Sequence, residues 1–156
     1  PDTFLDVPFV PTDEHVIRAM LQLGKVGPRD ILYDLGSGDG RIPVTAAKEF
    51  GIRAVGIDIN PARILEANAN AEEAGVTDKV TFIEGDLFEA NISEATVVTL
   101  YLLQSLNVKL RPKLLSELRP GTRIVSHAFD MANEWEPEET REVDGAMIYL
   151  WTVPER

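Results

Sequence analysis

The chain has 156 residues, of which 15 are Lys or Arg and 26 are Asp or Glu, so its formal net charge is −11. This length suits one domain over residues 1–156 that buries its own core. The chain has no cysteine, which excludes disulfides and thiolate metal ligands, and its two histidines are far apart in the sequence, which argues against a zinc site. The negative charge repels phosphate backbones, so it disfavours nucleic acid and favours a basic protein as partner, although it also serves solubility alone.

Strand-like and helix-like runs alternate along most of the chain, which is the pattern of an α/β fold. Thr12 is expected to cap a first helix that ends near Leu23. Strands are predicted over residues 31–35, 54–58, 80–84, 96–102 and 123–126, and further helices over residues 41–50, 60–75 and 105–118. Because Pro112 lies inside the last of these helices, we expect that helix to break into two pieces there.

The C-terminal part departs from this alternation. Residues 129–139 are polar and have room for little more than a loop. Residues 141–143 and 147–153 are predicted to form a β-hairpin, because the Asp144-Gly145 pair between them favours a type I′ turn. Parallel strands followed by an antiparallel hairpin differ from a plain dinucleotide-binding domain, which continues with further strand and helix units.

A glycine-rich loop joins the first predicted strand to the next helix. Asp34, Gly36, Gly38 and Gly40 follow one another at every second position. Glycine allows positive φ and close approach of a ligand, and the N-terminus of the following helix suits a carboxylate or a phosphate. The dinucleotide fingerprint G-x-G-x-x-G fails here, because Arg41 stands where its last glycine is required.

Acidic residues also follow the next two predicted strands. Asp58 comes 18 residues after Gly40 and can accept both hydroxyls of a ribose, which NAD and S-adenosylmethionine share. Asp86 can accept a hydrogen bond from an adenine amino group, with Leu87 against the ring. Each residue taken alone has the less favoured alternative of an ordinary turn residue. Together they place a nucleoside-containing ligand at the carboxyl ends of the strands.

Three segments, DLGSGDG at 34–40, IDIN at 57–60 and EGDLF at 84–88, together resemble class I S-adenosylmethionine-dependent methyltransferases. Segments 7–12, 34–42, 95–103 and 112–127 narrow the resemblance to protein-lysine methyltransferases. That group includes a small archaeal enzyme and mitochondrial enzymes acting on ATP synthase subunit c and the adenine nucleotide translocase. The resemblance extends from about residue 7 to residue 153. It implies a Rossmann-like class I fold, with a mostly parallel seven-stranded sheet, a C-terminal antiparallel hairpin and helices on both faces.

The resemblance also implies S-adenosylmethionine as the cofactor, S-adenosylhomocysteine as its product, and a set of cofactor-binding residues. These are Gly36, Ser37, Gly38 and Gly40 beside the methionine part, Asp34 at its amino group, Asp58 and Ile59 at the ribose, Asp86 and Leu87 at the adenine, Phe9 and Thr12 folded over the cofactor, and Leu100 with Tyr101 beneath the methyl group. For Phe9, simple packing of an N-terminal aromatic remains an alternative.

The acceptor implied by the resemblance is the side-chain amine of a protein lysine. Tyr101, His127 and Asp130 stand near the ends of the fourth and fifth strands, but none has a context that marks it as a base, so no catalytic residue is assigned. Residues 99–102 lack the Asn/Asp-Pro-Pro-aromatic motif of enzymes that methylate the amino groups of bases and glutamine.

Other functions stay open on the sequence alone. They are a small-molecule methyltransferase, a non-catalytic module that binds S-adenosylmethionine, and, least favoured, a nicotinamide-dependent oxidoreductase. No window approaches the roughly 18 apolar residues of a membrane span, and the first residues do not open a signal peptide, so we expect a cytoplasmic protein. The oligomeric state is left unassigned.

Overall fold

The computed structural model describes residues 11–156. It contains a seven-stranded sheet in the order β3-β2-β1-β4-β5-β7-β6. The strands are β1 Ile31–Leu35, β2 Arg53–Asp58, β3 Val80–Glu84, β4 Val97–Leu100, β5 Arg123–His127, β6 Glu139–Val143 and β7 Ala146–Thr152. The first five are parallel, whereas β7 runs antiparallel to both β5 and β6. The predicted fold class, including the C-terminal hairpin, is confirmed.

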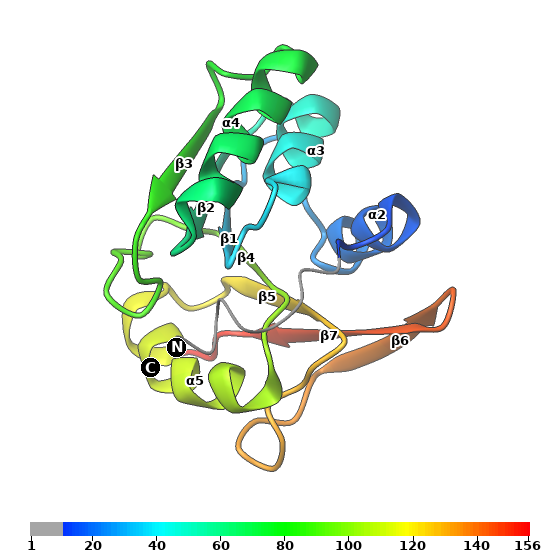
Figure 1. Ribbon diagram of the computed structural model, residues 1–156. Helices are drawn as coiled ribbons and strands as arrows, with labels where there is room; N and C mark the ends of the chain where they lie inside the picture. Colours follow the sequence, from blue (N-terminus) through cyan, green and yellow to red (C-terminus); the bar gives the residue numbers. More distant parts are fainter. Residues whose placement is uncertain (1–10) are drawn as a thin grey trace.

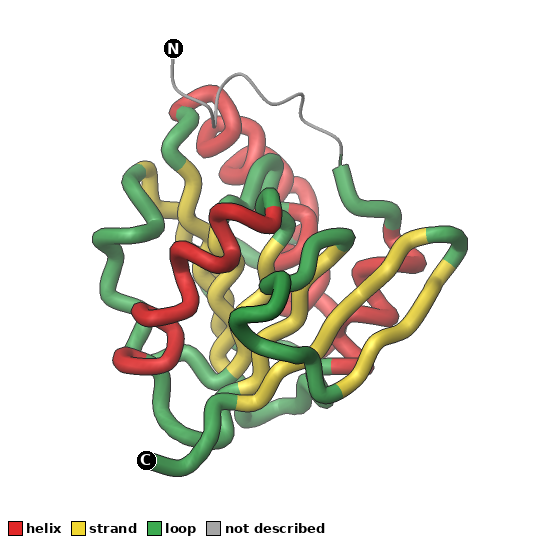
Figure 2. Tube along the Cα trace, turned by 90° about the horizontal axis from the view of Figure 1, so that it is seen from below, coloured by secondary structure: helices red, strands yellow, loops and turns green. Residues whose placement is uncertain are grey.

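Helices cover both faces of this sheet (Figures 1 and 2). They are α2 Glu14–Leu23, α3 Arg41–Phe50, α4 Pro61–Ala74 and α5 Gln104–Glu117. Buried residues of α2, α3 and α4 share one hydrophobic cluster with one face of the sheet, and those of α5 share a second cluster with the other face. The parallel strands therefore end at a common edge between two apolar layers, which is where ligands bind in open α/β sheets.

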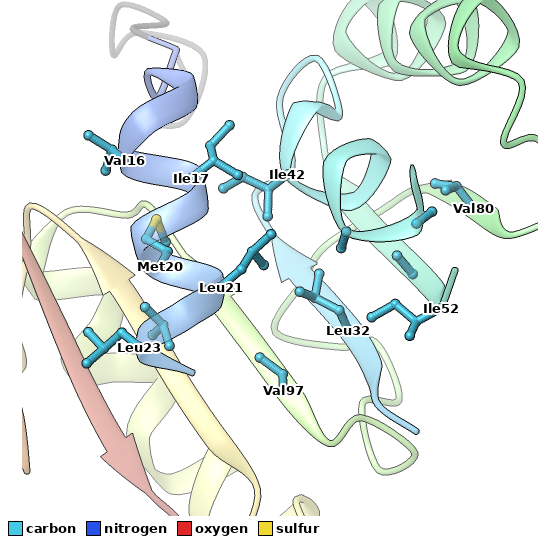
Figure 3. Packing of buried hydrophobic residues seen from close by; sticks show 14 of the residues in the cluster. Val16, Ile17, Met20, Leu21, Leu23, Leu32, Ile42, Ile52, Val80 and Val97 are labelled. Atoms are coloured by element: carbon cyan, nitrogen blue, oxygen red, sulfur yellow. The ribbon is translucent and has the colours of Figure 1, made fainter. Parts of the chain in front are cut away.

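The first layer depends strongly on α2. Its apolar residues recur every three or four positions, and Val16, Ile17, Met20 and Leu21 are all buried. Figure 3 shows Ile17 and Leu21 directed toward Ile42 of α3 and Leu32 of β1, whereas Val16 points to the opposite side of the helix. At about 1.5–3 kcal/mol for each large apolar side chain removed from water, this contact fixes α2 against the sheet.

On the opposite face, α5 is continuous from Gln104 to Glu117. The predicted break at Pro112 is therefore wrong. Pro112 is exposed, while Leu110 and Leu114 on either side of it are fully buried in the second cluster. The packing of these two leucines outweighs the hydrogen bond that proline removes from the helix.

Of the predictions made for the ends of helices and strands, the cap at Asn60 and the turn at Asp144-Gly145 are confirmed, and the cap at Thr12 is wrong. Asn60 caps α4, because its side chain accepts from the backbone N–H of Ala62 at 2.9 Å, as expected. Asp144 and Gly145 both adopt positive φ, 51° and 83°, which is the backbone of the predicted type I′ turn. Thr12 does not cap α2: the N-cap residue is Asp13, without a side-chain hydrogen bond, and the Thr12 hydroxyl lies elsewhere.

Candidate functional site

The glycine-rich loop turns sharply at the end of β1. Gly36, Gly38 and Gly40 have φ values of 84°, 57° and 81°, a region that favours glycine. The backbone N–H groups of Gly36 and Ser37 both donate to the Ile57 carbonyl oxygen, at 2.8 and 3.0 Å. The loop is therefore held across the end of β2 by the main chain, and its glycines are required by its conformation.

Close packing behind this loop involves two residues that the sequence had not singled out. A Cβ atom on Gly56 of β2 would lie 2.7 Å from Ser37 Cβ and from Phe82 Cδ1. A Cβ on Gly40 would lie 2.5 Å from Phe82 Cζ and 2.8 Å from Ala67 Cβ. The ring of Phe82 thus fills the space that both glycines leave. The available signal was the isolated glycine inside a predicted strand, which marks a close approach.

A pocket opens beside the loop, with about 300 Å³ of empty space that includes some open to solvent. Its walls come from the residues before α2, the end of β1, the glycine-rich loop, the first turn of α3 and the residue after β4. They are Pro11, Thr12, Asp34, Gly36, Ser37, Asp39, Arg41, Ile42 and Tyr101. The pocket therefore brings together several residues that were predicted at the methionine end of the cofactor.

Two polar side chains in this pocket suit an ammonium or hydroxyl-bearing ligand. Asp34 is 2% exposed, and its carboxylate accepts from the Thr99 hydroxyl at 2.9 Å. Burial raises the pKa of Asp34 to about 8. The hydroxyl of Ser37 is buried without a hydrogen-bond partner among residues 11–156. An unpaired buried hydroxyl and a desolvated carboxyl are both stabilised by a ligand that supplies donors, so the site fits the charged amino-acid end of S-adenosylmethionine.

Asp58 ties the ends of three strands together. Its carboxylate accepts from the backbone N–H groups of Gly38, at 2.8 Å, and Asn60, at 2.9 Å. Its carbonyl oxygen accepts from the N–H of Gly85, at 2.9 Å. Each carboxylate oxygen has a further lone pair, so Asp58 can still accept from ribose hydroxyls.

The remaining predicted cofactor residues lie in different surroundings. Asp86 is exposed and accepts from the backbone N–H of Phe88 at 2.9 Å, while Leu87 is buried and Ile59 half-buried. Leu100 is fully buried in the cluster on the α5 face, whereas its neighbour Tyr101 lines the pocket. Phe9 lies outside the described residues. Asp58, Ile59, Asp86 and Leu87 follow β2 and β3 and are not among the residues that line the pocket.

At the other end of the pocket, three rings lie together after β4 and β5. The Tyr101 ring centroid is 4.1 Å from that of His127 and 6.4 Å from that of Phe129. His127 is buried, and burial lowers the pKa of its imidazole. Of the candidates near these strand ends, Tyr101 and His127 are in contact, while Asp130 accepts from the side-chain amide of Gln104.

Thr12 links the two ends of the pocket. Its hydroxyl is 3.0 Å from Nδ1 of His127, and its carbonyl oxygen accepts from the Arg41 guanidinium at 3.2 Å. The same guanidinium pairs with the Asp39 carboxylate at 2.7 Å. Arg41, which sequence reasoning used only to reject a dinucleotide site, therefore connects the loop to the segment before α2.

Within residues 11–156 there is no group of three or more His, Asp or Glu side chains arranged to hold a metal ion. The same part of the chain has no helix with the length and apolar character needed to cross a membrane.

Comparisons with known proteins agree on the chemistry of the site. The model of the ANTKMT methyltransferase domain family matches residues 34–139. The chain is 53% identical to a protein-lysine N-methyltransferase of Saccharolobus islandicus, over 96% of this chain and 95% of that protein. It is 35% identical to the adenine nucleotide translocase lysine N-methyltransferase of Mus musculus, over 85% of this chain and 57% of that protein. The chain thus spans little more than half the length of this mouse relative.

A solved structure is similar to this protein over almost the whole length of both chains. A crystal structure of an RNA methyltransferase from Salinibacter ruber, in complex with S-adenosyl-L-homocysteine, superposes with a TM-score of 0.91 and 56% identity. The match covers 94% of this chain and 95% of that one. These similar proteins share the cofactor chemistry but differ in the acceptor that their names give.

Proposed function

Because the chain belongs to the ANTKMT methyltransferase domain family and is an S-adenosylmethionine-dependent methyltransferase, we propose that its acceptor is the side-chain amine of lysine in proteins. The observation that carries this proposal is the match to the Saccharolobus islandicus lysine methyltransferase, which extends over 95% of that protein. The net charge of −11 supports it further, because an acidic surface attracts lysine-rich partners.

The pocket supports the proposal because its two ends are lined by residues of different chemical character. Asp34, Ser37 and the glycine-rich loop line one end and suit the cofactor. Tyr101 lines the pocket as well, and its ring packs against the rings of His127 and Phe129. When bound, the cofactor supplies a methyl group activated by a sulfonium, and the protein contributes alignment and electrostatics. The lysine amine has an ordinary pKa near 10.4, so it must lose its proton, which can leave to water through the open side of the pocket.

RNA is a second candidate acceptor, favoured by the 56% identity to the Salinibacter ruber enzyme. The charge balance weighs against it, since binding a phosphate backbone depends on clustered Lys and Arg, and this chain has 15 such residues against 26 acidic ones. A cytoplasmic location and a basic substrate remain predictions made from the sequence.

The proposal is tested by methyl transfer to a mixed panel. The protein is incubated with methyl-labelled S-adenosylmethionine, several lysine-rich proteins and total RNA, and each fraction is analysed by mass spectrometry. We expect mass increases in multiples of one methyl group on lysine residues. The Gly36→Val variant is the matched control, because its side chain would meet Leu102 at 2.8 Å and block the cofactor loop. Label in RNA, with none on lysine, would overturn the proposal.

A further inference from the structure

Three rings beside the cofactor pocket form a continuous surface, which we call the acceptor wall: Tyr101, His127 and Phe129. Tyr101 lies between the other two, tilted by 31° against His127 and stacked at 27° against Phe129. Tyr101 directly follows β4, His127 ends β5 and Phe129 comes two residues later. Since β4 and β5 are parallel neighbours, these rings gather at the strand edge that carries the pocket.

Tyr101 and Phe129 are half-buried and His127 is buried, so the accessible ring surface of the acceptor wall belongs to Tyr101 and Phe129. The face of an aromatic ring is electronegative and attracts cations. A protonated His127 would oppose such attraction, and burial disfavours that form by lowering the pKa of the imidazole. The Thr12 hydroxyl at 3.0 Å from Nδ1 fixes the orientation of that ring.

A buried amide holds the wall in place from behind. Asn107 of α5 is fully buried and donates through Nδ2 to the carbonyl oxygens of Phe129, at 3.0 Å, and Asp130, at 3.2 Å. The hydroxyl of Ser126 donates to the same Phe129 carbonyl at 2.6 Å. The segment that carries Phe129 is therefore fixed to α5 and β5, so the wall is formed before any ligand arrives.

We propose that the acceptor wall is the binding site for the acceptor lysine, with the rings contacting its ammonium group and its aliphatic stem. This inference rests on the proposed function and names the part of the site that receives the acceptor. Tyr101 is shared with the cofactor pocket, which places the wall next to the methyl donor, whereas Phe129 is not among the residues lining that pocket. A nucleobase can also stack on such rings, but the net charge of −11 favours the ammonium.

Phe129 provides the sharpest variants, because it belongs to the wall without lining the cofactor pocket. Phe129→Leu removes the ring and keeps an apolar side chain, whereas Phe129→Tyr keeps a ring. With the lysine peptide most heavily labelled in the panel, we expect Phe129→Leu to raise KM about 2- to 30-fold, the range of a cation–π contact. Phe129→Tyr should restore KM, and the Kd of S-adenosylhomocysteine should stay within about twofold of the wild-type value in both variants, since neither touches the cofactor. An unchanged KM in Phe129→Leu would overturn the inference.

A second measurement needs no turnover and uses the wild-type protein saturated with S-adenosylhomocysteine. A short peptide carrying trimethyllysine is titrated while the ring protons of Tyr101, His127 and Phe129 are followed by NMR. The control is the same peptide with a carbon atom in place of the charged nitrogen, and nucleoside monophosphates form a third arm. We expect the ring signals to shift with the charged peptide and much less with its neutral isostere. Equal shifts for both peptides, or shifts with nucleotides alone, would overturn the ammonium site.

The two experiments separate the inference from the proposed function. If the wild-type protein labels no lysine, the proposed function fails irrespective of the ring signals. If lysine is labelled but Phe129→Leu leaves KM unchanged, only the acceptor wall is refuted.

Discussion

Replacing Asp34 by Asn should make the cofactor-free protein more stable at neutral pH. Asp34 has its pKa raised from 3.8 to about 8, because burial penalises the charged carboxylate. A group whose pKa is higher in the folded state stabilises the fold fully below its unfolded pKa, and that contribution is lost as the pH rises toward its folded pKa. At about 1.4 kcal/mol for each pH unit above 3.8, the loss at pH 7 is at most about 4 kcal/mol.

Asparagine keeps an oxygen that can accept from the Thr99 hydroxyl, and it removes the charge. Its amide N–H groups are new buried donors, which offset part of the gain. The expected net stabilisation at pH 7 is therefore about 1–3 kcal/mol, shrinking as the pH falls toward 4. Urea unfolding at several pH values between 4 and 8 measures it, with the exposed Asp78→Asn as the matched control.

The same substitution should weaken cofactor binding, because the carboxylate that we expect beside the cofactor's ammonium group is replaced by a neutral amide. In the wild-type protein the ammonium favours the ionised carboxyl, so the affinity for S-adenosylhomocysteine should rise with pH up to about 8. Calorimetry measures both effects. A stability difference that does not vary with pH, or an Asn variant that binds the cofactor as well as the wild type, would refute this reasoning.

Three further substitutions test other parts of the site. Asp58→Ala should weaken S-adenosylhomocysteine binding by about 1–3 kcal/mol by calorimetry, and an unchanged Kd would contradict the ribose assignment. Gly56→Ala should lower the free energy of unfolding by about 1–3 kcal/mol, since its Cβ would lie 2.7 Å from Phe82; an unaltered urea midpoint would show that the strand yields without cost. Thr12→Val should cost about 1–3 kcal/mol of stability by leaving Nδ1 of His127 without its partner, and the imidazole NMR signals should move; unmoved signals would refute that hydrogen bond.

The sequence predicted the sheet well because its strands are short apolar runs bounded by clear turn residues. The turn at Asp144-Gly145 and the cap at Asn60 depend on neighbouring residues only, so they could be inferred locally. Pro112 is the contrary case: its local preference is overridden by Leu110 and Leu114, whose burial depends on the far side of the sheet.

In the site, the glycine-rich loop could be inferred because the spacing of its glycines indicates a tight turn with positive φ. The hydrogen bond between Thr12 and His127 could not be inferred, because His127 lies 115 residues away in the sequence, and Thr12 was therefore expected to cap α2 instead. Asn107 escaped notice for the same reason: a polar residue in a helix gives no indication that it will be buried against the carbonyl of Phe129. Tertiary contacts of this kind decide how the rings of Tyr101, His127 and Phe129 are held beside the pocket, and a pattern along one segment does not contain them.

The packing of Phe82 against Gly40 and Gly56 has a consequence for how this family can change over time. Each glycine leaves room for the same ring, but Gly40 is also required by its φ of 81°, so only at position 56 can a larger residue be accommodated by a smaller one at position 82. Positions 56 and 82 should therefore co-vary among homologues, with a larger side chain at 56 accompanied by a smaller one at 82, while position 40 stays glycine. An aromatic residue at 82 paired with alanine at 56 should be rare, and Phe82→Leu should reduce the cost of Gly56→Ala to that of the remaining contact with Ser37.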